Sequence, residues 1–554
     1  MSDSPLTIVI VGGVAGGASA ATRARRMNEH ARIILFEKDE YVSFANCGLP
    51  YHIGGEIAKR DSLLVATAEL LTQRFRLDVR VRHEVQRIDR DAKTVTVLNH
   101  TTGETRNERY DKLILAPGAS PVVPKIEGAD ASNVFTLRNV ADMDRINEAV
   151  AASKSKRAAV VGAGFIGLEM VEQLARRGLR TSLVELEPQV LPLLDHEMAK
   201  PLETELGRNG VTLYLGDGIQ RVLTDDQGMA TGIQLQSGSE IEADLVILGI
   251  GVRPNVELAQ QAGLDIGPSG GIATNQYMQT SDPDVYAVGD AAEYTFGPTG
   301  QSMRIALAGP ANRAGRLAGE HAATGTSAPM ANVFGTSIVR VFELCAAMSG
   351  LTAKLAKRLN VATRSVTIVA DHHAGYYPKA APITLKLTFD PDTGKVLGCQ
   401  AVGREGVDKR VDVIATAMAM NGTVRDLAGL DLAYAPPFGS AKDPIHMAAF
   451  AACNQLDGVE QFLDADVDLG GKQVVDVRTP REVQKRPLAA ADHAVNIPVD
   501  NLRDRIGELD QSAETVVSCG IGLRAHVALR ILKQSGFSDV KNLSGGMTVR
   551  NRAV

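Results

Sequence analysis

Two cysteines stand in sequence settings that favour thiol chemistry. Cys47 lies within residues 41–51 and is followed by Gly48 and Pro50, which are typical of a turn that leads into a helix. The dipole at a helix N-terminus stabilises a thiolate and lowers the pKa of a thiol placed there. This position predicts a redox-active Cys47, and the alternative is a buried cysteine that only packs.

The second cysteine is Cys519, the first residue of a loop between an expected strand and an expected helix. Residues 515–518 have the composition of a buried strand, and they lead into the six-residue loop CGIGLR, residues 519–524, before an expected helix. A loop between a strand and a helix can turn its backbone N–H groups toward one anion. Together with the helix dipole, Arg524 is expected to lower the pKa of the Cys519 thiol and make it a catalytic nucleophile.

The first element that must position Cys47 is a dinucleotide-binding unit. Residues 7–11 form a continuous apolar run, as in a buried parallel strand, and a glycine turn, an alanine-rich helix and a second strand ending in Glu37 follow. Glycines let the backbone approach a pyrophosphate at a helix N-terminus, and the acid accepts a hydrogen bond from ribose. Cys47, ten residues after Glu37, would then lie beside the ring of a bound flavin. The residues predicted to hold this first dinucleotide are Gly12, Gly13, Ala15, Gly16, Glu37 and Lys38.

The glycine turn of this unit departs from the G-x-G-x-x-G pattern at one position. Val14 stands where the second glycine belongs, so a plain tight turn is the alternative interpretation. The acid at position 37 favours the dinucleotide interpretation.

A second unit repeats the pattern about 150 residues later and has all three glycines. An apolar run at residues 158–161 precedes Gly162, Gly164 and Gly167, and a later strand ends in Glu185. An acid in this place favours the free 2′-hydroxyl of NADH and repels the 2′-phosphate of NADPH. The chain is therefore predicted to hold two dinucleotides, with NADPH as the alternative at the second site. A solvated strand end is the alternative for Glu185.

Two later segments are each expected to form a strand that runs into a tight turn and leads back to the flavin domain. Residues 110–119 and 243–255 have this form and contribute Ala116, Gly118 and Gly251. Asp290 follows a short apolar strand, where a carboxylate can accept a hydrogen bond from a ribityl hydroxyl, and a helix cap is the alternative. Ala308 opens the next expected helix and is assigned to the same site.

Composition excludes several classes of protein. The chain of 554 residues has a net charge of −6 and no basic block, which argues against a nucleic-acid partner. Its apolar runs are too short to span a bilayer, so no membrane insertion is expected. Five scattered cysteines have neither disulfide nor metal spacing, which predicts no metal site and a reducing, cytoplasmic location.

Residues 1 to about 325, with these motifs in this order, resemble the pyridine nucleotide-disulfide oxidoreductases, in which a NAD domain is inserted into a split FAD domain. Typical members carry two cysteines five residues apart, but here Val42 and His52 occupy both positions five away from Cys47. This resembles the single-cysteine branch of NADH oxidase, NADH peroxidase and coenzyme A-disulfide reductase. The phrase at residues 43–47 resembles the last of these most. The resemblance assigns Ser43 and Asn46 to both cofactor and coenzyme A, and Arg26 to a coenzyme A phosphate, with a solvated helix arginine as the alternative.

The remaining chain resembles two further domains. Residues 326 to about 445 are similar to the dimerisation domain of that branch, in which two tyrosines of the partner subunit face the active cysteine, and these roles fall on Tyr376 and Tyr434. A tyrosine hydroxyl can protonate a leaving thiolate, and the alternative is a pair of interface tyrosines. The tail, with its Asp-Val-Arg, Asn-Ile-Pro, cysteine-loop and Gly-Gly motifs in order, resembles a rhodanese domain.

The predicted fold class is α/β, with two Rossmann-like FAD- and NAD(P)-binding domains, an α+β dimerisation domain and a C-terminal α/β rhodanese domain. The expected boundaries are 1–150 with 245–325 for FAD, 151–244 for NAD(P)H, 326–450 for dimerisation, 451–465 for a linker and 466–554 for rhodanese.

The resemblance implies a homodimeric, FAD-dependent reductase that uses NAD(P)H to reduce coenzyme A disulfide, coenzyme A persulfide or polysulfide, while the rhodanese domain handles sulfane sulfur. One alternative is an NADH oxidase or peroxidase that cycles through a cysteine sulfenic acid. The other is a non-enzymatic sulfur carrier or redox sensor.

Overall fold

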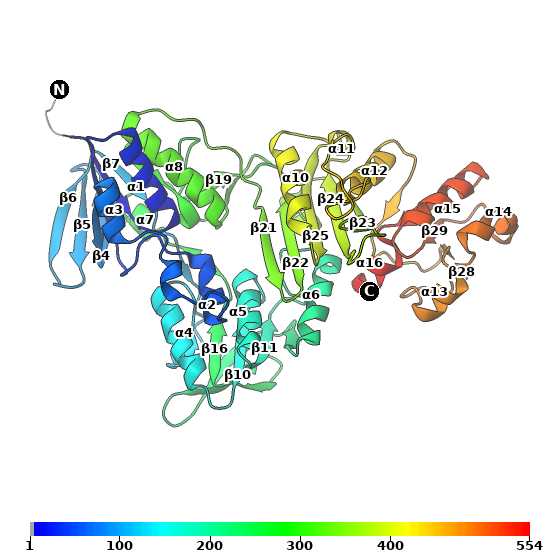
Figure 1. The fold of residues 1–554 in the computed structure, drawn as a ribbon, viewed down its shortest axis with the longest axis horizontal. Coiled ribbons are helices and arrows are strands. Elements are labelled where there is room, and N and C mark those ends of the chain that lie inside the picture. The colour runs from blue at the N-terminus through cyan, green and yellow to red at the C-terminus, as the bar shows by residue number, and fades with distance from the viewer. Residues whose placement is uncertain (1–4) are drawn as a thin grey trace. The chain divides into compact units, whose positions relative to one another are not determined.

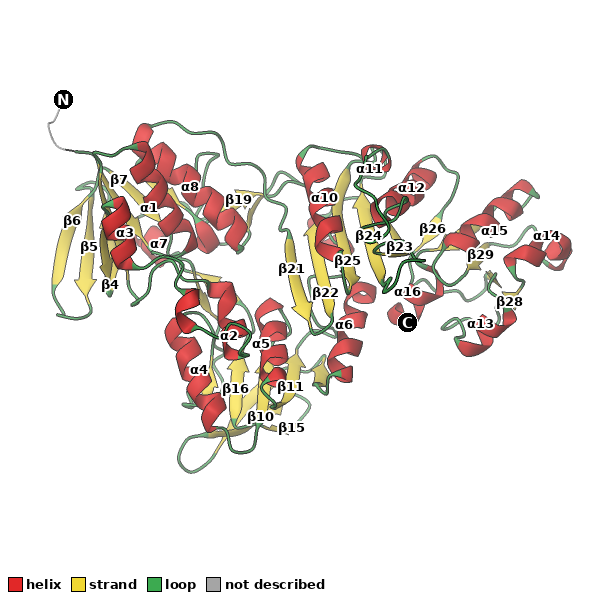
Figure 2. Ribbon diagram, viewed as in Figure 1, coloured by secondary structure: helices red, strands yellow, loops and turns green. Residues whose placement is uncertain are grey.

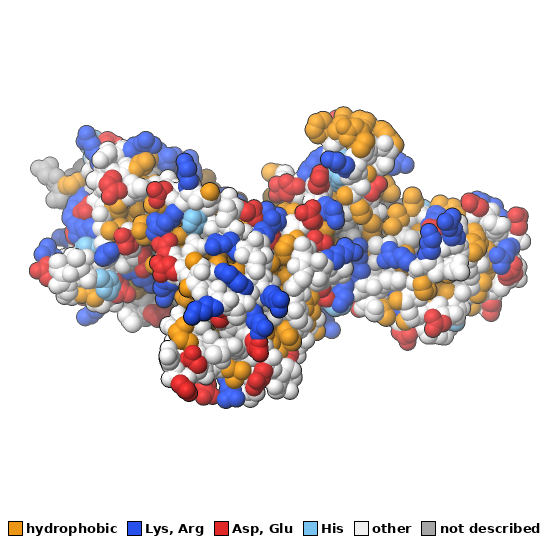
Figure 3. Space-filling model, turned by 60° about the horizontal axis from the view of Figure 1, so that its bottom comes forward, with side chains coloured by type: hydrophobic (Ala, Val, Ile, Leu, Met, Phe, Trp, Pro, Cys, Tyr) orange, Lys and Arg blue, Asp and Glu red, His pale blue; other side chains and the backbone are white. Residues whose placement is uncertain are grey.

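The computed structural model describes residues 5–554, which form two compact units. The first unit runs to Leu186 and resumes over Asp217–Gly335, and the second consists of Glu187–Gly216 and Thr336–Val554. Helices and strands alternate through most of the chain (Figure 2), and acidic and basic side chains are interspersed over the face drawn in Figure 3. Among the described residues, no helix has both the length and the apolar character needed to cross a membrane.

The first sheet is parallel and gathers strands from distant parts of the chain. Its order is β18 (Val285–Ala287), β7 (Lys112–Leu115), β1 (Thr7–Val11), β2 (Arg32–Glu37) and β3 (Asp78–Val81). The apolar run of β1 is fully buried, as expected for a strand covered on both faces. Helices α1 (Ala15–Met27) and α8 (Ala308–Thr324) lie side by side (Figure 1). A Cβ on Gly315 would lie 2.1 Å from the carbonyl oxygen of Gly16, so glycine permits this close helix contact.

The second parallel sheet of this unit has the order β11 (Arg180–Glu185), β10 (Arg157–Val161), β16 (Leu245–Leu248) and β9 (Val134–Phe135). Helices α4 (Val140–Ala152) and α5 (Phe165–Arg176) belong to this region. The unit also contains two three-stranded antiparallel sheets: β4 (His83–Asp89), β5 (Thr94–Asn99) and β6 (Thr105–Arg109), and β13 (Ile219–Thr224), β14 (Ala230–Leu235) and β15 (Glu240–Glu242).

The second unit contains an antiparallel sheet of order β21 (Ser337–Val341), β22 (Leu344–Gly350), β25 (Val396–Gly403), β24 (Pro382–Phe389) and β23 (Arg364–Asp371). Helix α10 (Val407–Ala419) packs on β22 and β25, and α12 (Pro444–Leu456) packs on β23 and β24.

Helix α6 (His196–Arg208) also packs on this antiparallel sheet, against β22 and β25. A buried lysine holds it there, because Lys386 Nζ lies 2.8 Å from Asp195 Oδ2 and 2.6 Å from Glu197 Oε1. Gln400 Nε2 donates a further hydrogen bond of 2.7 Å to Asp195 Oδ2. Residues 187–216, which were expected in the NAD(P)H domain, are therefore grouped with the second unit.

The C-terminal sheet of the second unit is parallel, with the order β26 (Phe462–Leu463), β30 (Val540–Leu543), β29 (Thr515–Ser518), β27 (Gln473–Asp476) and β28 (Val495–Asn496). Helices α13 (Pro480–Lys485), α15 (Leu523–Gln534) and α16 (Gly546–Ala553) surround it. Residues 451–465, which were expected to form a linker, contain regular structure at both ends. Helix α12 continues to Leu456, and β26 already pairs with β30.

The C-terminal domain is docked on the antiparallel sheet of its own unit. The Thr367 N–H donates to Ser544 Oγ at 2.8 Å, and Arg552 Nη1 donates to Thr384 Oγ1 at 2.8 Å. Helix α16 also packs against α6.

The remaining elements are short connections and edge pieces. They are α2 (Leu49–Ile53), α3 (Ala68–Phe75), α7 (Glu257–Gln261), α9 (Ala353–Leu359), α11 (Val424–Ala428), α14 (Leu502–Arg505), β8 (Ala119–Pro121), β12 (Thr212–Leu215), β17 (Val252–Pro254), β19 (Glu293–Thr295) and β20 (Ser302–Arg304). Two parallel sheets with helices, an antiparallel sheet with helices and a C-terminal parallel sheet confirm the predicted fold class.

Candidate functional site

The first glycine turn brings β1, β7 and α1 together. Gly12 has φ +95°, and a Cβ there would lie 2.1 Å from the carbonyl oxygen of Ala116, so a side chain would block the approach of the two turns. Glu37 is buried, and its Oε2 accepts the Gly13 N–H at 2.7 Å. Burial raises the pKa of Glu37, and the hydrogen bonds from Asp39 and Gly13 oppose that shift.

The N-terminus of α1 suits an anionic ligand. Val14 is its N-cap and offers no side-chain cap, and no acid lies in the first turn, which starts at Ala15 and Gly16. The first backbone N–H groups and the positive end of the helix dipole therefore remain available for a pyrophosphate. These residues fit FAD, and Val14 does not obstruct the turn that the second glycine usually forms. Lys38, assigned to the same ligand, is exposed beside it.

The loop that carries Cys47 is tied to this glycine turn. Ser43 adopts a left-handed backbone with φ 47°, its N–H donates to the Gly13 carbonyl at 2.8 Å, and its carbonyl accepts the Val65 N–H at 3.0 Å. Asn46 Nδ2 donates to the carbonyl oxygen of Arg138 at 2.7 Å. Cys47 follows in a single 3-10 turn, η1 (Asn46–Gly48), which runs directly into α2.

The expectation of a lowered pKa at Cys47 is wrong for this structure. Although the side chain reaches solvent, the protein around its other sides removes water and raises the pKa of the Cys47 thiol, and the negative charges of Glu169 and Asp290 raise it further. Helix α2 has only five residues, so it supplies little dipole to oppose these effects. Tyr51 on α2 donates to Glu169 Oε1 on α5 at 3.1 Å, which keeps that carboxylate near the thiol.

Arg138 is a site residue that the sequence did not single out. Its Nη1 lies 3.8 Å from Asp290 Oδ2, and a Cβ on Gly118 would lie 2.6 Å from its Nη2. It precedes α4 in a loop without a motif, so no sequence signal marked it. Arg138 thus contacts three assigned positions: its carbonyl accepts from Asn46, and its guanidinium lies beside Gly118 and Asp290.

Ala308 and Gly251 were assigned to the first dinucleotide, and Arg26 was assigned to a coenzyme A phosphate. Ala308 begins α8, whose N-cap Leu307 provides no side-chain cap. Gly251 has φ +117°, and its carbonyl accepts the Val122 N–H at 2.9 Å. Arg26 is exposed on the last turn of α1, where it donates to the Thr22 carbonyl at 3.0 Å and lies over the ring of Phe75.

The second glycine turn has the same architecture. Gly162 has φ +100°, and a Cβ on Gly167 would lie 1.8 Å from its carbonyl oxygen. Gly164 is the N-cap of α5 without a side-chain cap, and no acid lies in the first helical turn. Glu185, at the end of β11, accepts the Ala163 N–H at 2.6 Å and so stands at the turn. This donor set fits the phosphates and ribose of NAD(P)H.

The two assigned tyrosines meet in the second unit. The hydroxyl oxygens of Tyr376 and Tyr434 lie 3.1 Å apart, and the hydrogen bond between them raises the pKa of Tyr376. Tyr376 is 78% exposed and Tyr434 is 49% exposed, so both rings are presented outward. Tyr377 instead packs edge-on against His373 of its own loop.

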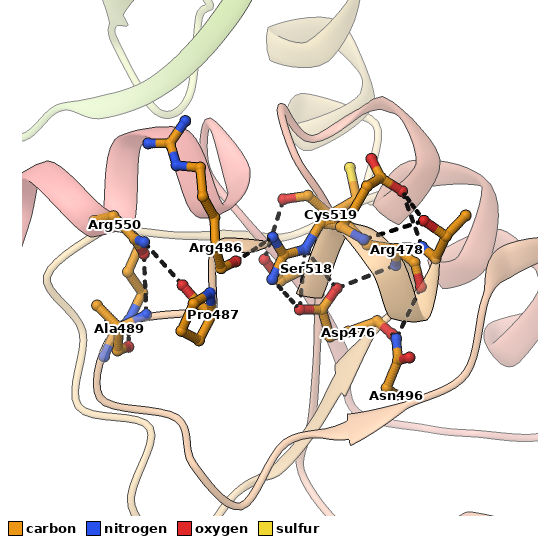
Figure 4. Close-up of polar contacts among 12 residues, drawn as sticks. Asp476, Arg478, Arg486, Pro487, Ala489, Asn496, Ser518, Cys519 and Arg550 are labelled. Atoms are coloured by element: carbon orange, nitrogen blue, oxygen red, sulfur yellow. Dashed lines mark hydrogen bonds and ion pairs between the residues drawn. The ribbon is translucent and has the colours of Figure 1, made fainter. Parts of the chain in front are cut away.

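The Cys519 loop forms a compact cradle. Cys519 is buried, and its Sγ accepts the Gly522 N–H at 3.1 Å. Gly522, with φ +100°, is the N-cap of α15. A Cβ on Gly546 would lie 2.5 Å from the Cys519 carbonyl oxygen, so the start of α16 can pack on the loop only as glycine. Below the loop, a buried ion pair of 2.5 Å joins Arg478 to Asp476, and Arg478 Nη1 also donates to the Arg486 carbonyl at 2.6 Å (Figure 4).

Arg524 closes the cradle together with a carboxylate that the sequence did not single out. Its Nη1 and Nη2 donate to Glu482 at 2.9 and 2.7 Å. Glu482 Oε2 also accepts the Thr479 N–H at 2.9 Å, as the reciprocal partner in the capping box of α13. These hydrogen bonds, with that of Arg524 first, hold the pKa of Glu482 well below its usual range, and they raise the pKa of Arg524. The Thr-Pro-Arg-Glu run was the signal that could have revealed Glu482.

Three family models match the chain. The model described as pyridine nucleotide-disulphide oxidoreductase matches residues 6–315, and that of its dimerisation domain matches residues 336–444. The model of the rhodanese-like domain matches residues 460–550.

Named proteins are similar over most or all of the chain. Coenzyme A disulfide reductase of Staphylococcus aureus strain JH9 is 35% identical over 445 residues, which is 80% of this chain and 99% of that protein. The crystal structure of reduced Bacillus anthracis CoADR-RHD is 45% identical with a TM-score of 0.95, covering 99% of this chain and 98% of the other. The NAD-dependent persulfide reductase from A. fulgidus is 36% identical with a TM-score of 0.91, covering 98% and 100%.

Proposed function

The chain belongs to the pyridine nucleotide-disulphide oxidoreductases, and on that premise we propose that it is an NADH-dependent flavoenzyme that reduces coenzyme A disulfide and coenzyme A persulfide through Cys47. Membership of this family implies FAD and NAD(P)H as cofactors. One observation carries the proposal: a single-cysteine turn beside a dinucleotide cradle and a Cys519 loop occur in the same chain. The chain is also similar to a protein named coenzyme A disulfide reductase and to one named NAD-dependent persulfide reductase.

The roles of the chain's own residues follow from their chemistry. The turn at Gly12 and Gly13 and the carboxylate of Glu37 would hold FAD, which, when bound, supplies a route for two electrons from the nicotinamide to sulfur. The second turn and Glu185 would hold the nicotinamide nucleotide. Since Glu185 stands where a ribose would lie, NADH is the proposed reductant.

Cys47 carries the sulfur chemistry. Its thiolate attacks one sulfur of coenzyme A disulfide, a sulfur–sulfur bond to Cys47 forms, the original one breaks, and one coenzyme A thiolate leaves. With coenzyme A persulfide, attack at the inner sulfur gives the same mixed disulfide and releases hydrosulfide. Two electrons derived from NADH then cleave the mixed disulfide to two thiolates, which restores Cys47.

The proton for the leaving thiolate has a proposed source in a second copy of the chain. The chain carries a dimerisation domain, and Tyr376 and Tyr434 present their hydroxyl groups outward as a hydrogen-bonded pair. A phenol placed beside a leaving thiolate can donate a proton to it. We therefore assign these two tyrosines to the active site of the partner subunit and the assembly to a homodimer. The five cysteines are few and scattered, which supports the cytoplasm as the location.

The oxidase or peroxidase alternative uses the same cysteine but has no role for Cys519. An oxygen-reducing enzyme needs no sulfur-carrying loop, and a sensor without turnover needs no second complete dinucleotide turn. The docked rhodanese domain therefore favours a sulfur substrate over both alternatives.

Steady-state oxidation of NADH tests the proposal. The purified, FAD-loaded protein should oxidise NADH rapidly with coenzyme A disulfide or coenzyme A persulfide, and slowly with oxygen or hydrogen peroxide alone. Turnover with peroxide that exceeds turnover with both sulfur substrates would replace the proposal with the peroxidase alternative.

A further inference from the structure

The one cation within the Cys519 loop is paired with a carboxylate. Arg524 is the one cationic side chain among residues 519–524. Its two terminal nitrogens form a bidentate pair with Glu482, whose Oε2 is held in addition by the Thr479 N–H at 2.9 Å and hydroxyl at 2.8 Å. Because the carboxylate is fixed by these four hydrogen bonds, the charge of Arg524 is balanced at the site where a donor must enter.

The rim of the same loop is apolar. Ile521, within the loop, is 43% exposed, and Leu523, the first residue of α15, is 56% exposed. Val527 lies one helical turn further on the same face and is 43% exposed. Large apolar side chains next to a buried thiol favour a donor with an uncharged, partly apolar arm, since burying such an arm removes apolar surface from water.

We propose that this loop selects organic persulfides whose sulfur is carried on an uncharged arm, as on pantetheine, and discriminates against thiosulfate. Ile521 and the Glu482–Arg524 pair are the specificity-determining residues. Thiosulfate brings two negative charges to a mouth whose one loop cation is already balanced, whereas a persulfide brings one. The inference deepens the proposed function and rests on its sulfur-handling part.

The transfer step is a sulfur exchange without net oxidation. The Cys519 thiolate attacks the terminal sulfur of the persulfide R–S–S⁻, a new sulfur–sulfur bond forms, and the donor's own sulfur–sulfur bond breaks. The products are R–S⁻ and the Cys519 persulfide, so charge and sulfur balance with no added reductant. The Gly522 N–H, which already donates to Cys519 Sγ at 3.1 Å, is placed to stabilise negative charge on the attacking sulfur.

The test measures sulfur loading of Cys519 in the full-length, FAD-loaded protein by intact mass spectrometry, without NADH. Pantetheine persulfide and thiosulfate are compared as donors. The wild type should load from pantetheine persulfide at least about tenfold more efficiently than from thiosulfate. Ile521→Arg and Glu482→Gln should each raise the efficiency with thiosulfate about tenfold by adding or freeing positive charge.

Ile521→Met is the matched control that separates charge from shape, and glutamine is chosen at position 482 to keep the fold. Ile521→Met keeps a long apolar side chain and should leave the donor preference unchanged. Glu482→Gln keeps the helix cap, because glutamine can replace glutamate in a capping box. A wild type that prefers thiosulfate, or a preference unaffected by both Ile521→Arg and Glu482→Gln, would overturn the proposal. NADH-dependent reduction of coenzyme A disulfide by the wild type is measured in parallel. Its absence would refute the proposed function, whereas the donor preference of Cys519 is measured without NADH and is decided separately.

Discussion

Replacing Lys386 with methionine should destabilise the packing of α6 on the antiparallel sheet. Lys386 is buried between Asp195, at 2.8 Å, and Glu197, at 2.6 Å. Methionine keeps the volume but leaves two carboxylates without their cation, and breaking a buried pair in this way costs about 3–5 kcal/mol. Asp195 retains the hydrogen bond from Gln400 at 2.7 Å, which places the expected loss near the lower end, about 3 kcal/mol.

The pH dependence follows from the directions of the pKa shifts. Within the cluster, Lys386 and the hydrogen bonds hold the pKa of Asp195 below its ordinary value, although burial alone would raise it. The two carboxylates raise the pKa of Lys386, against burial. A lowered acid pKa contributes stability that is lost only as the pH falls through the folded value. A raised lysine pKa contributes stability that is lost only as the pH rises through its folded value. Between about pH 5 and pH 9, a range that lies between the ordinary pKa values of aspartate and lysine, the contribution of this cluster to stability should therefore be constant in the wild type.

In Lys386→Met the direction of the pKa shift reverses for Asp195. Without the cation, burial raises the folded pKa of the Asp195 carboxyl group, so protonation relieves the penalty and stability should increase as the pH is lowered from 8 toward 5.

Hydrogen exchange of peptides from α6 and β24 measures this locally, which avoids treating a multidomain chain as one two-state transition. A loss of about 3 kcal/mol corresponds to exchange that is roughly 150-fold faster. The variant Asp195→Asn, Glu197→Gln, Lys386→Met removes all three charges and should recover most of the protection. Exchange within about threefold of the wild type, at every pH, would refute this account of the cluster.

Three further predictions concern activity. Cys47→Ser should abolish NADH-dependent reduction of coenzyme A disulfide while FAD remains reducible by NADH, whereas Cys519→Ser should retain that activity and lose polysulfide reduction. Equal failure of Cys519→Ser with both acceptors, in NADH-oxidation assays, would instead indicate one obligatory relay. Glu185→Ser should raise kcat/KM for NADPH about tenfold, or about 1.4 kcal/mol, and a wild type that already prefers NADPH tenfold would contradict the ribose argument. Glu169→Gln removes a negative charge that raises the pKa of Cys47, so iodoacetamide should alkylate Cys47 faster near neutral pH. An unchanged pH profile of alkylation would show that the charge of Glu169 does not contribute to the pKa of Cys47.

Local patterns made the glycine turns predictable from the sequence. Gly12, Gly162 and Gly522 all have positive φ values, and in each case a strand, a glycine and a helix follow one another directly in the chain. The acids that end β2 and β11 could be placed for the same reason. Strand, turn and helix signals are local, so they survive in a single sequence.

Long-range electrostatics could not be predicted in this way. The predicted direction of the pKa shift at Cys47 was wrong because its causes arise only in the fold: burial of the thiol first, and then the charges of Glu169 and Asp290, which come from distant segments. Arg138 lies in a loop without a motif, and Lys386 stands in a strand whose pattern does not reveal its acidic partners on another element. Strand β26, which lies within the expected linker, was missed because it has only two residues, too few to show a period.

The docking of the C-terminal domain through Ser544 and Arg552 changes how sulfur reaches or leaves Cys519. A domain on a free tether meets its target at an effective concentration set by tether length. Here the position of Cys519 is fixed relative to the antiparallel sheet. Lengthening the connection after α12 should therefore leave the rate of sulfur transfer to Cys519 unchanged unless the contacts of Ser544 and Arg552 are also removed. A carrier of sulfur must therefore reach Cys519 where the antiparallel sheet holds its domain, because the domain does not swing out to meet the carrier.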